Sequence, residues 1–199
     1  MSTFHFLRQQ RLQNESDTAR SLADFVAPAP FKDYCGAFVV TAGPEVEAIA
    51  EEYKNKGDDY LSIMAKAVGA RIAEALAEML HKKVRDEWGI SDPEGFTLQD
   101  LIKEKYRGVR PAPGYPACPD HTEKPTIWKL LDAKKLTDVY LTENLAMHPA
   151  SSVCGYYMGH SESKYFNLGK IDRDQLADYA KRKGKSEKEL ERWLSPNLL

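Results

Sequence analysis

The chain has 199 residues, of which 42% are hydrophobic and 29% are charged, with a formal net charge of −2 at pH 7. This composition excludes wholesale disorder, and the small net charge excludes an overall field that would attract nucleic acid or an anionic membrane. The chain has neither an apolar run of the roughly 18 residues that span a membrane nor a secretory signal pattern. Its three cysteines are odd in number and widely separated, so we expect no disulfide framework and a cytoplasmic location.

The first third of the chain predicts two short helices and a strand. Residues 3–12 are predicted as a short helix. Residues 31–41 form an apolar run that predicts a buried strand, which ends at the breaker Ala42-Gly43-Pro44. Pro44 then begins a helix that extends to about Asn55, since proline and acidic residues both favour a first turn.

A long helix is predicted from a cap at Asp58 to about Trp88-Gly89. Its apolar residues recur at the spacing of one helix face, which predicts that this face is buried in the core. They are Tyr60, Ile63, Met64, Ala67, Val68, Ile72, Ala75, Leu76, Met79, Leu80 and Val84. Such a helix is about 45 Å long, which matches the roughly 40 Å diameter of a compact chain of this size. We therefore expect residues 1–199 to form one domain around a central helix.

The second half of the chain predicts short helices and strands that cluster rather than alternate. Helices are expected at 97–106 and 126–131, and strands at 139–145, 153–158 and 165–171, with bulges or tight bends at Gly155 and Gly159. Asp172 caps a further helix that ends at Gly184, and Ser186 begins a last helix that Pro196 terminates. This order predicts an α+β fold with a mostly antiparallel sheet and C-terminal helices.

Residues 106–124, which we call the proline ribbon, hold four prolines and two glycines. Each proline fixes its own φ, removes a backbone donor and extends the residue before it, so the segment is neither a helix nor a central strand. We expect a stiff, kinked segment whose backbone groups at Ala112, Gly114 and Tyr115 find few partners in one another. Water, protein or a ligand must then satisfy these groups.

The side chains of the proline ribbon favour a ligand. Arg110 can place two parallel hydrogen bonds on a carboxylate or phosphate, and Tyr115 can lie against a flat ring or a cation. The pattern predicts a site for a small molecule with an anionic end and a planar or cationic part. The alternative is a rigid connection that packs on the core through Tyr106 and Tyr115.

Other motifs favour structural roles. The chain has no dinucleotide-binding, phosphate-loop or nucleophile-elbow pattern, and Asp120 and His121 beside Cys118 lack a second cluster with metal-ligand spacing. The basic run at 181–185 resembles a helix-turn-helix patch, but cations also suit the last turn of a helix. Glu74 and Glu78 lie off the apolar face of the long helix, where Arg71 and Lys82 favour a solvated surface.

The part of the proline ribbon from Arg110 to Lys124 resembles the S-adenosylmethionine-binding loop of the activation domain of cobalamin-dependent methionine synthase. The resemblance runs essentially from end to end. It includes the segments 7–10, 22–28, 33–38, 58–60, 141–143, 163–165 and 192–198 and the long helix.

This resemblance implies a domain that binds S-adenosylmethionine and supports the reductive methylation of oxidised cobalamin. Arg110 would bind the methionyl carboxylate, and backbone groups from Ala112 through Gly114 to Tyr115 would hold the rest of the ligand. Tyr165 and the acidic residues Glu74 and Glu104 would also line the site. The resemblance further implies that cobalamin is supplied by another module or chain, and that a flavodoxin-type reductant provides the electron.

Three departures from the family pattern are visible. The family's domain begins upstream of Met1, and that portion contributes an acidic ligand contact, so we expect a missing N-terminal part. The aromatic pair after Lys164 is Tyr165-Phe166, which lacks the second hydroxyl. The chain also has no Asp-x-His-x-x-Gly motif for the lower cobalamin ligand. An alternative function is a non-catalytic docking module for the cobalamin domain and flavodoxin with weak or no S-adenosylmethionine binding; a nucleic-acid module at 181–185 is not expected.

Overall fold

The computed structural model of the protein describes residues 2–11 and 18–199. Its helices are α1 (Glu45–Asn55), α2 (Asp59–Glu87), α3 (Leu98–Ile102), α4 (Lys124–Leu131), α5 (Ala133–Thr137), α6 (Arg173–Lys183) and α7 (Glu187–Leu194). Its strands are β1 (Cys35–Thr41), β2 (Tyr140–Leu141), β3 (Met147–His148) and β4 (Ser152–Met158), and both strand pairs are antiparallel. The predicted α+β class is confirmed. Within the described ranges, no helix combines the length and apolarity that a membrane span requires.

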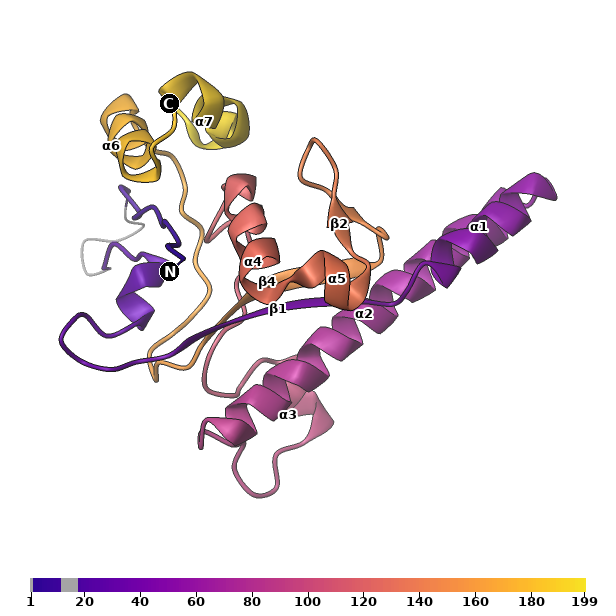
Figure 1. The fold of residues 1–199 in the computed structure, drawn as a ribbon. Helices are drawn as coiled ribbons and strands as arrows, with labels where there is room; N and C mark the ends of the chain where they lie inside the picture. Colours follow the sequence, from indigo (N-terminus) through magenta and orange to yellow (C-terminus); the bar gives the residue numbers. More distant parts are fainter. Residues whose placement is uncertain (1, 12–17) are drawn as a thin grey trace.

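The β1–β4 pair is the centre of the fold. Its register runs without interruption from Cys35 opposite Met158 to Thr41 opposite Ser152. Successive side chains of a strand point to opposite faces, so neighbouring tyrosines enter different parts of the core. Tyr157 packs with residues of α2, whereas Tyr156 packs with residues that include Ile127 of α4. The strand pair therefore lies between α2 on one side and α4 and α5 on the other (Figure 1).

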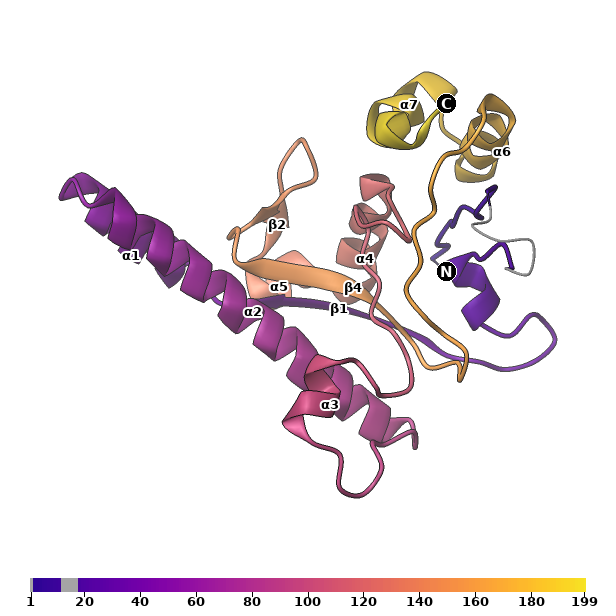
Figure 2. The ribbon, with the colours of Figure 1, turned by 180° about the vertical axis from the view of Figure 1, so that it is seen from behind.

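Helix α2 has the predicted bounds because its end signals are local. The Asp58 carboxylate accepts a hydrogen bond from the Leu61 N–H (2.9 Å), and Gly89 leaves the helix with a φ of +71°. The helix lies along one side of the molecule, away from α6 and α7, with α1 packed beside its first half (Figure 2).

The predicted core face of α2 is wrong for most of its length. Exposed fractions of Tyr60, Ile63, Met64, Val68, Ile72 and Met79 lie between 42% and 70%. The buried positions are instead Ser62, Gly69, Ala73, Ala77, His81 and Arg85. Small residues allow close approach: a Cβ on Gly69 would lie 2.4 Å from a Val46 methyl carbon of α1. Only Leu76, Leu80 and Val84 of the predicted face pack against the core.

Two predicted elements have other conformations. The predicted helix at 3–12 is not a helix over its described residues; Arg8 forms a bridge with Ser21, and Leu7 is buried among the C-terminal helices. Residue 12 lies outside the described residues. The segment 165–171 is not a strand, since its backbone contacts are isolated: Leu168 N–H donates to Pro116 O (2.9 Å), and Ile171 forms a single bridge with Leu198.

The C-terminal helices form a third core cluster with Leu7, Leu168 and Ile171. Helix α6 has the predicted bounds: Asp172 and Gln175 form its capping box, and Gly184 follows it with a φ of +64°. One cation of the basic run is not solvated. The Lys183 side chain is 4% exposed and contacts Asp120 and Glu123, each at 2.5 Å. This contact joins α6 to the end of the proline ribbon.

Candidate functional site: a cleft over the central strand pair

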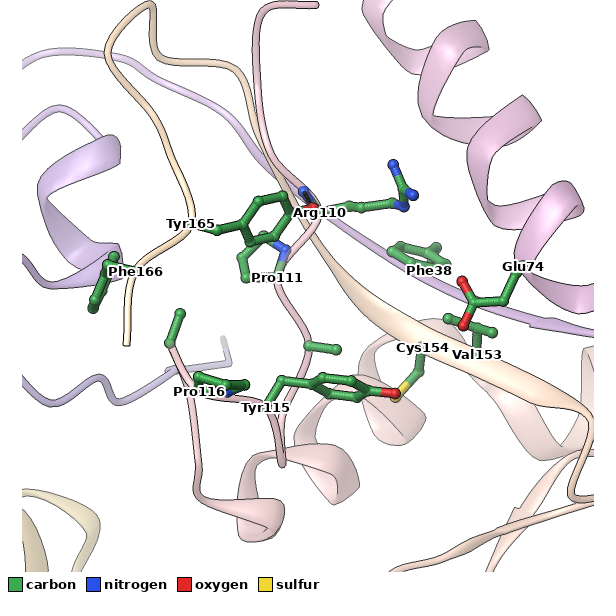
Figure 3. Close-up of a pocket in the computed structure, with 12 residues that line it drawn as sticks. Phe38, Glu74, Arg110, Pro111, Tyr115, Pro116, Val153, Cys154, Tyr165 and Phe166 are labelled. Atoms are coloured by element: carbon green, nitrogen blue, oxygen red, sulfur yellow. Dashed lines mark hydrogen bonds between the residues drawn. The ribbon is translucent and has the colours of Figure 1, made fainter. Parts of the chain in front are cut away.

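A cleft of about 250 Å³ lies where the proline ribbon passes over β1 and β4. Strands β1 and β4, helix α2, the ribbon and the segment after Lys164 all contribute to its lining (Figure 3). The lining residues are Phe38, Glu74, Arg110, Pro111, Ala112, Tyr115, Pro116, Ala117, Val153, Cys154, Tyr165 and Phe166.

The ribbon begins as a partial third strand on β4. Val109 and Met158 exchange backbone hydrogen bonds of 3.0 Å, and the Pro111 carbonyl accepts from the Tyr156 N–H at 2.9 Å. Gly155 makes this approach possible, because a Cβ there would lie 2.7 Å from the Pro111 oxygen and 2.9 Å from the Phe38 ring. The expected bulge at Gly155 is wrong: the register is regular, and the missing side chain makes room for the ribbon.

The N–H groups of Gly114 and Tyr115 are paired within the ribbon, contrary to the prediction. Gly114 N–H donates to the Cys118 carbonyl (2.7 Å), and Tyr115 N–H donates to the Ala112 carbonyl (3.2 Å). Gly114 has a φ of +95°, which folds the segment into a tight turn that the proline count alone does not reveal. The Ala112 N–H has no hydrogen-bond partner among the described residues and lies at the cleft.

Arg110 is held on several sides. Its Nη1 donates to the Tyr106 hydroxyl (2.6 Å), and its Nη2 lies 2.6 Å from a Glu78 oxygen. Its backbone N–H donates to the Tyr165 hydroxyl at 3.1 Å. Burial lowers the pKa of Arg110, but Tyr106 and Glu78 raise it by more, so the net shift is upward. Figure 3 shows the side chain extending from the ribbon toward α2.

Beneath Arg110 lies a stack of three rings. Phe38 stacks on Tyr157 with ring centres 4.7 Å apart, and Tyr157 stacks on His81 at 5.2 Å. Burial, with the nearby charges of Arg85 and Arg110, lowers the pKa of His81 to about 3. The imidazole is therefore neutral at pH 7, and its Nδ1 lies 3.4 Å from Arg110 Nη1. Phe38 is the ring of this stack that lines the cleft, and the uncharged rings of Tyr157 and His81 lie behind it.

Five of the predicted site residues line the cleft: Glu74, Arg110, Ala112, Tyr115 and Tyr165. Gly114 lies outside the lining, in the turn next to it, where a Cβ would lie 2.3 Å from the His121 ring. Glu104 also lies outside the lining, exposed at the end of α3 with a φ of +50°. Sequence reasoning thus located one wall of the cleft.

The strand residues of the cleft were missed. Phe38, Val153 and Cys154 lie on β1 and β4, and their sequence pattern signals only burial. Burial raises the pKa of the Cys154 thiol to about 11, so it stays protonated at neutral pH. The interpretation of Glu78 as a solvated residue was wrong, since its side chain is 20% exposed and pairs with Arg110. Its expected partner Lys82 bonds Asp86 instead (2.9 Å).

Within the described ranges, no cluster of three or more His, Cys, Asp or Glu residues is arranged to hold a metal ion. The Asp120 carboxylate beside buried Cys118 contacts Lys183 and accepts a hydrogen bond from the Tyr179 hydroxyl (2.9 Å). These residues have a structural role.

The sequence and fold were compared with known proteins. The family model described as "Vitamin B12 dependent methionine synthase, activation domain" matches residues 1–184. The chain is also similar to a solved structure described as the MetH reactivation domain bound to AdoHcy. The TM-score is 0.93, and the sequences are 52% identical over 98% of this chain and 60% of that one.

Proposed function

Since the chain belongs to the family of the activation domain of vitamin B12-dependent methionine synthase, we propose that it binds S-adenosylmethionine in the cleft. It would present the methyl group to a cobalamin carried by another module or chain. The main observation in support is that Arg110 lines the cleft together with one carboxylate, that of Glu74. The cleft is also lined by two tyrosines, Tyr115 and Tyr165. The related solved domain, with AdoHcy bound, supports the same ligand class.

The cleft residues match the chemistry of S-adenosylmethionine. Arg110 can bind the carboxylate of its amino-acid end, and the Ala112 N–H, which has no partner in the described part of the chain, can donate to a polar atom of the ligand. Glu74 provides a negative charge for the sulfonium or the ammonium group. The exposed Tyr115 ring and the Tyr165 ring provide flat surfaces for the adenine.

The role of this chain in the reaction is binding and orientation. Transfer of a methyl group needs the bond between the sulfur and the methyl carbon to point at the acceptor. The cleft residues would hold the ligand in that orientation. S-adenosylmethionine would supply the methyl group and leave as S-adenosylhomocysteine, and a cobalamin reduced by a flavodoxin-type protein would be the methyl acceptor. The chain lacks the Asp-x-His-x-x-Gly motif for the lower cobalamin ligand, which supports a cofactor held by another module. The complete reaction is that of a methyltransferase in methionine biosynthesis.

The alternative, a docking module with weak or no S-adenosylmethionine binding, is not favoured. A relative at 52% identity is described with AdoHcy bound. The cleft of this chain also retains Arg110 and its supporting contacts.

Titration calorimetry with S-adenosylmethionine tests the proposal. We expect one-to-one binding by the wild type and a loss of about 10- to 150-fold in affinity in Arg110→Ala, because a hydrogen bond to a charged group contributes about 1.5–3 kcal/mol. Arg71→Ala, which removes an exposed arginine of α2, is the matched control and should bind like the wild type. Absence of binding heat at millimolar ligand, with the fold intact by circular dichroism, would refute the proposal.

A further inference from the structure

Arg110 is the cation of the proposed site, and three residues outside the cleft lining lie against its guanidinium: Glu78, Tyr106 and His81. We propose that Glu78 and Tyr106 are positioning residues that orient Arg110 so that its remaining N–H groups meet the carboxylate of the ligand's amino-acid end. This inference rests on the proposed function. It implies that Glu78 and Tyr106 favour ligands that have the amino-acid end over ligands that lack it.

The hydrogen bonds of the guanidinium leave donors for a ligand. The group has five N–H donors in one plane. Nη1 donates to the Tyr106 hydroxyl and Nη2 contacts Glu78, both at 2.6 Å, and Nη1 also lies 3.4 Å from His81 Nδ1. Nε has no hydrogen-bond partner among the described residues. Because the group is planar, two fixed nitrogens fix the direction of the remaining donors.

The two partners are themselves packed against other elements of the fold. Glu78 lies on α2, one turn after Glu74, which lines the cleft. Tyr106 is 7% exposed, and the buried Arg85 guanidinium lies 3.9 Å from its ring centre. Arg85 in turn is paired with Asp92 at 2.9 Å. Arg110 is therefore anchored through Tyr106 to a buried ion pair and through Glu78 to the longest helix.

Because the contact between Arg110 and Glu78 is mostly buried, we expect it to affect ligand affinity. The Arg110 and Glu78 side chains are 15% and 20% exposed, so water competes little for their contact. A long arginine side chain that is ordered before the ligand arrives loses less conformational freedom on binding. The second Glu78 oxygen is buried and has no hydrogen-bond partner among the described residues. An unsatisfied buried oxygen is unfavourable for stability, which favours a role for Glu78 in the site over a purely structural one.

Conservative variants separate these roles. Tyr106→Phe keeps the ring that packs on Arg85 and removes only the hydroxyl, and Glu78→Gln keeps the shape and removes the charge. Tyr34→Phe, at a residue that is 74% exposed, is the matched control. Titration calorimetry would measure the affinity for S-adenosylhomocysteine, and competition against that ligand would measure the affinity for methylthioadenosine. Differential scanning calorimetry would give the melting temperature of each variant without ligand.

We expect Tyr106→Phe and Glu78→Gln each to weaken S-adenosylhomocysteine binding about 3- to 30-fold. The affinity for methylthioadenosine, which lacks the amino-acid end, should change by less than about twofold. A change of that size is what a substitution distant from the ligand typically causes. Adding either change to Arg110→Ala should cause little further loss, because the contact acts through Arg110.

Equal losses for both ligands together with a lower melting temperature would overturn the proposal in favour of a structural role. Tighter binding in Glu78→Gln would overturn it in favour of Glu78 as a competitor of the ligand carboxylate. A wild-type chain that binds neither S-adenosylmethionine nor S-adenosylhomocysteine would refute the proposed function itself, whereas normal wild-type binding with unaffected variants would refute this inference alone.

Discussion

The Lys183 contact offers a direct test of how the C-terminal helices hold the proline ribbon. Its Nζ lies 2.5 Å from both Asp120 and Glu123 and donates to the Thr122 hydroxyl at 2.7 Å. The side chains of Lys183, Asp120 and Glu123 are at most 4% exposed. Replacing Lys183 by Met keeps most of the length of the side chain and removes its charged end. Two buried carboxylates then lose their cation.

Breaking such a buried pair typically lowers the free energy of unfolding by about 3–5 kcal/mol. For a chain of this size, about 2–4 °C of melting temperature corresponds to each kcal/mol, so Lys183→Met should melt about 6–20 °C lower. Urea unfolding at pH 7 measures the loss. Lys181→Met, at an exposed position two residues earlier on α6, is the control and should change stability by less than about 0.5 kcal/mol.

The pH dependence gives a second measurement of the same contact. Burial raises the pKa of Asp120, but Lys183 and Thr122 lower it by more, so its pKa lies below the ordinary value. In the wild type this stabilisation is present at pH 7 and is lost only as the pH falls below about 4. Without Lys183, burial raises the folded pKa above the unfolded one, so the deficit of Lys183→Met should shrink between pH 7 and pH 5. A variant as stable as Lys181→Met at pH 7, or a deficit that grows on acidification, would refute the reasoning.

Two further predictions concern the floor of the cleft. Gly155→Ala places a Cβ 2.7 Å from the Pro111 oxygen and 2.9 Å from the Phe38 ring. We expect urea unfolding to show a free energy of unfolding lower by about 1–3 kcal/mol, together with weaker S-adenosylmethionine binding. An unchanged stability would contradict this packing. His81 has a pKa lowered to about 3 by burial and by Arg85 and Arg110, so between about pH 6.5 and pH 3 the unfolded chain binds more protons at this site. Acidification below pH 6.5 should thus destabilise the wild type by up to about 1.4 kcal/mol per pH unit through this group. His81→Gln should show a shallower slope between pH 7 and pH 5, and equal slopes would show that His81 does not contribute.

The candidate site could be predicted from the sequence where its residues are contiguous. Arg110, Ala112 and Tyr115 lie within six residues of one another, and the prolines between them restrict the backbone locally. Phe38 and Cys154 could not be assigned to the site, because they reach it only through the pairing of β1 with β4. A buried strand residue has the same sequence signal whether it lines a cleft or fills the core.

The bounds of α2 and α6 were likewise determined by the sequence. Asp58 caps α2, and Gly89 and Gly184 adopt left-handed conformations just beyond the ends of the two helices. These signals act within one turn of the chain, so no distant segment needs to be known.

Only the tertiary structure decided which face of α2 is buried and which acid pairs with Arg110. The exposed Ile63 and Val68 have the spacing of a core face, yet the close approach of α1 and the strand pair selects the face of Gly69 and Ala77. Glu78 meets Arg110 from 32 positions earlier in the chain. Helix periodicity is a property of a single segment, so it can be predicted from the sequence. Burial and ion pairing depend on which other segments pack against that helix, so they are known only from the tertiary structure.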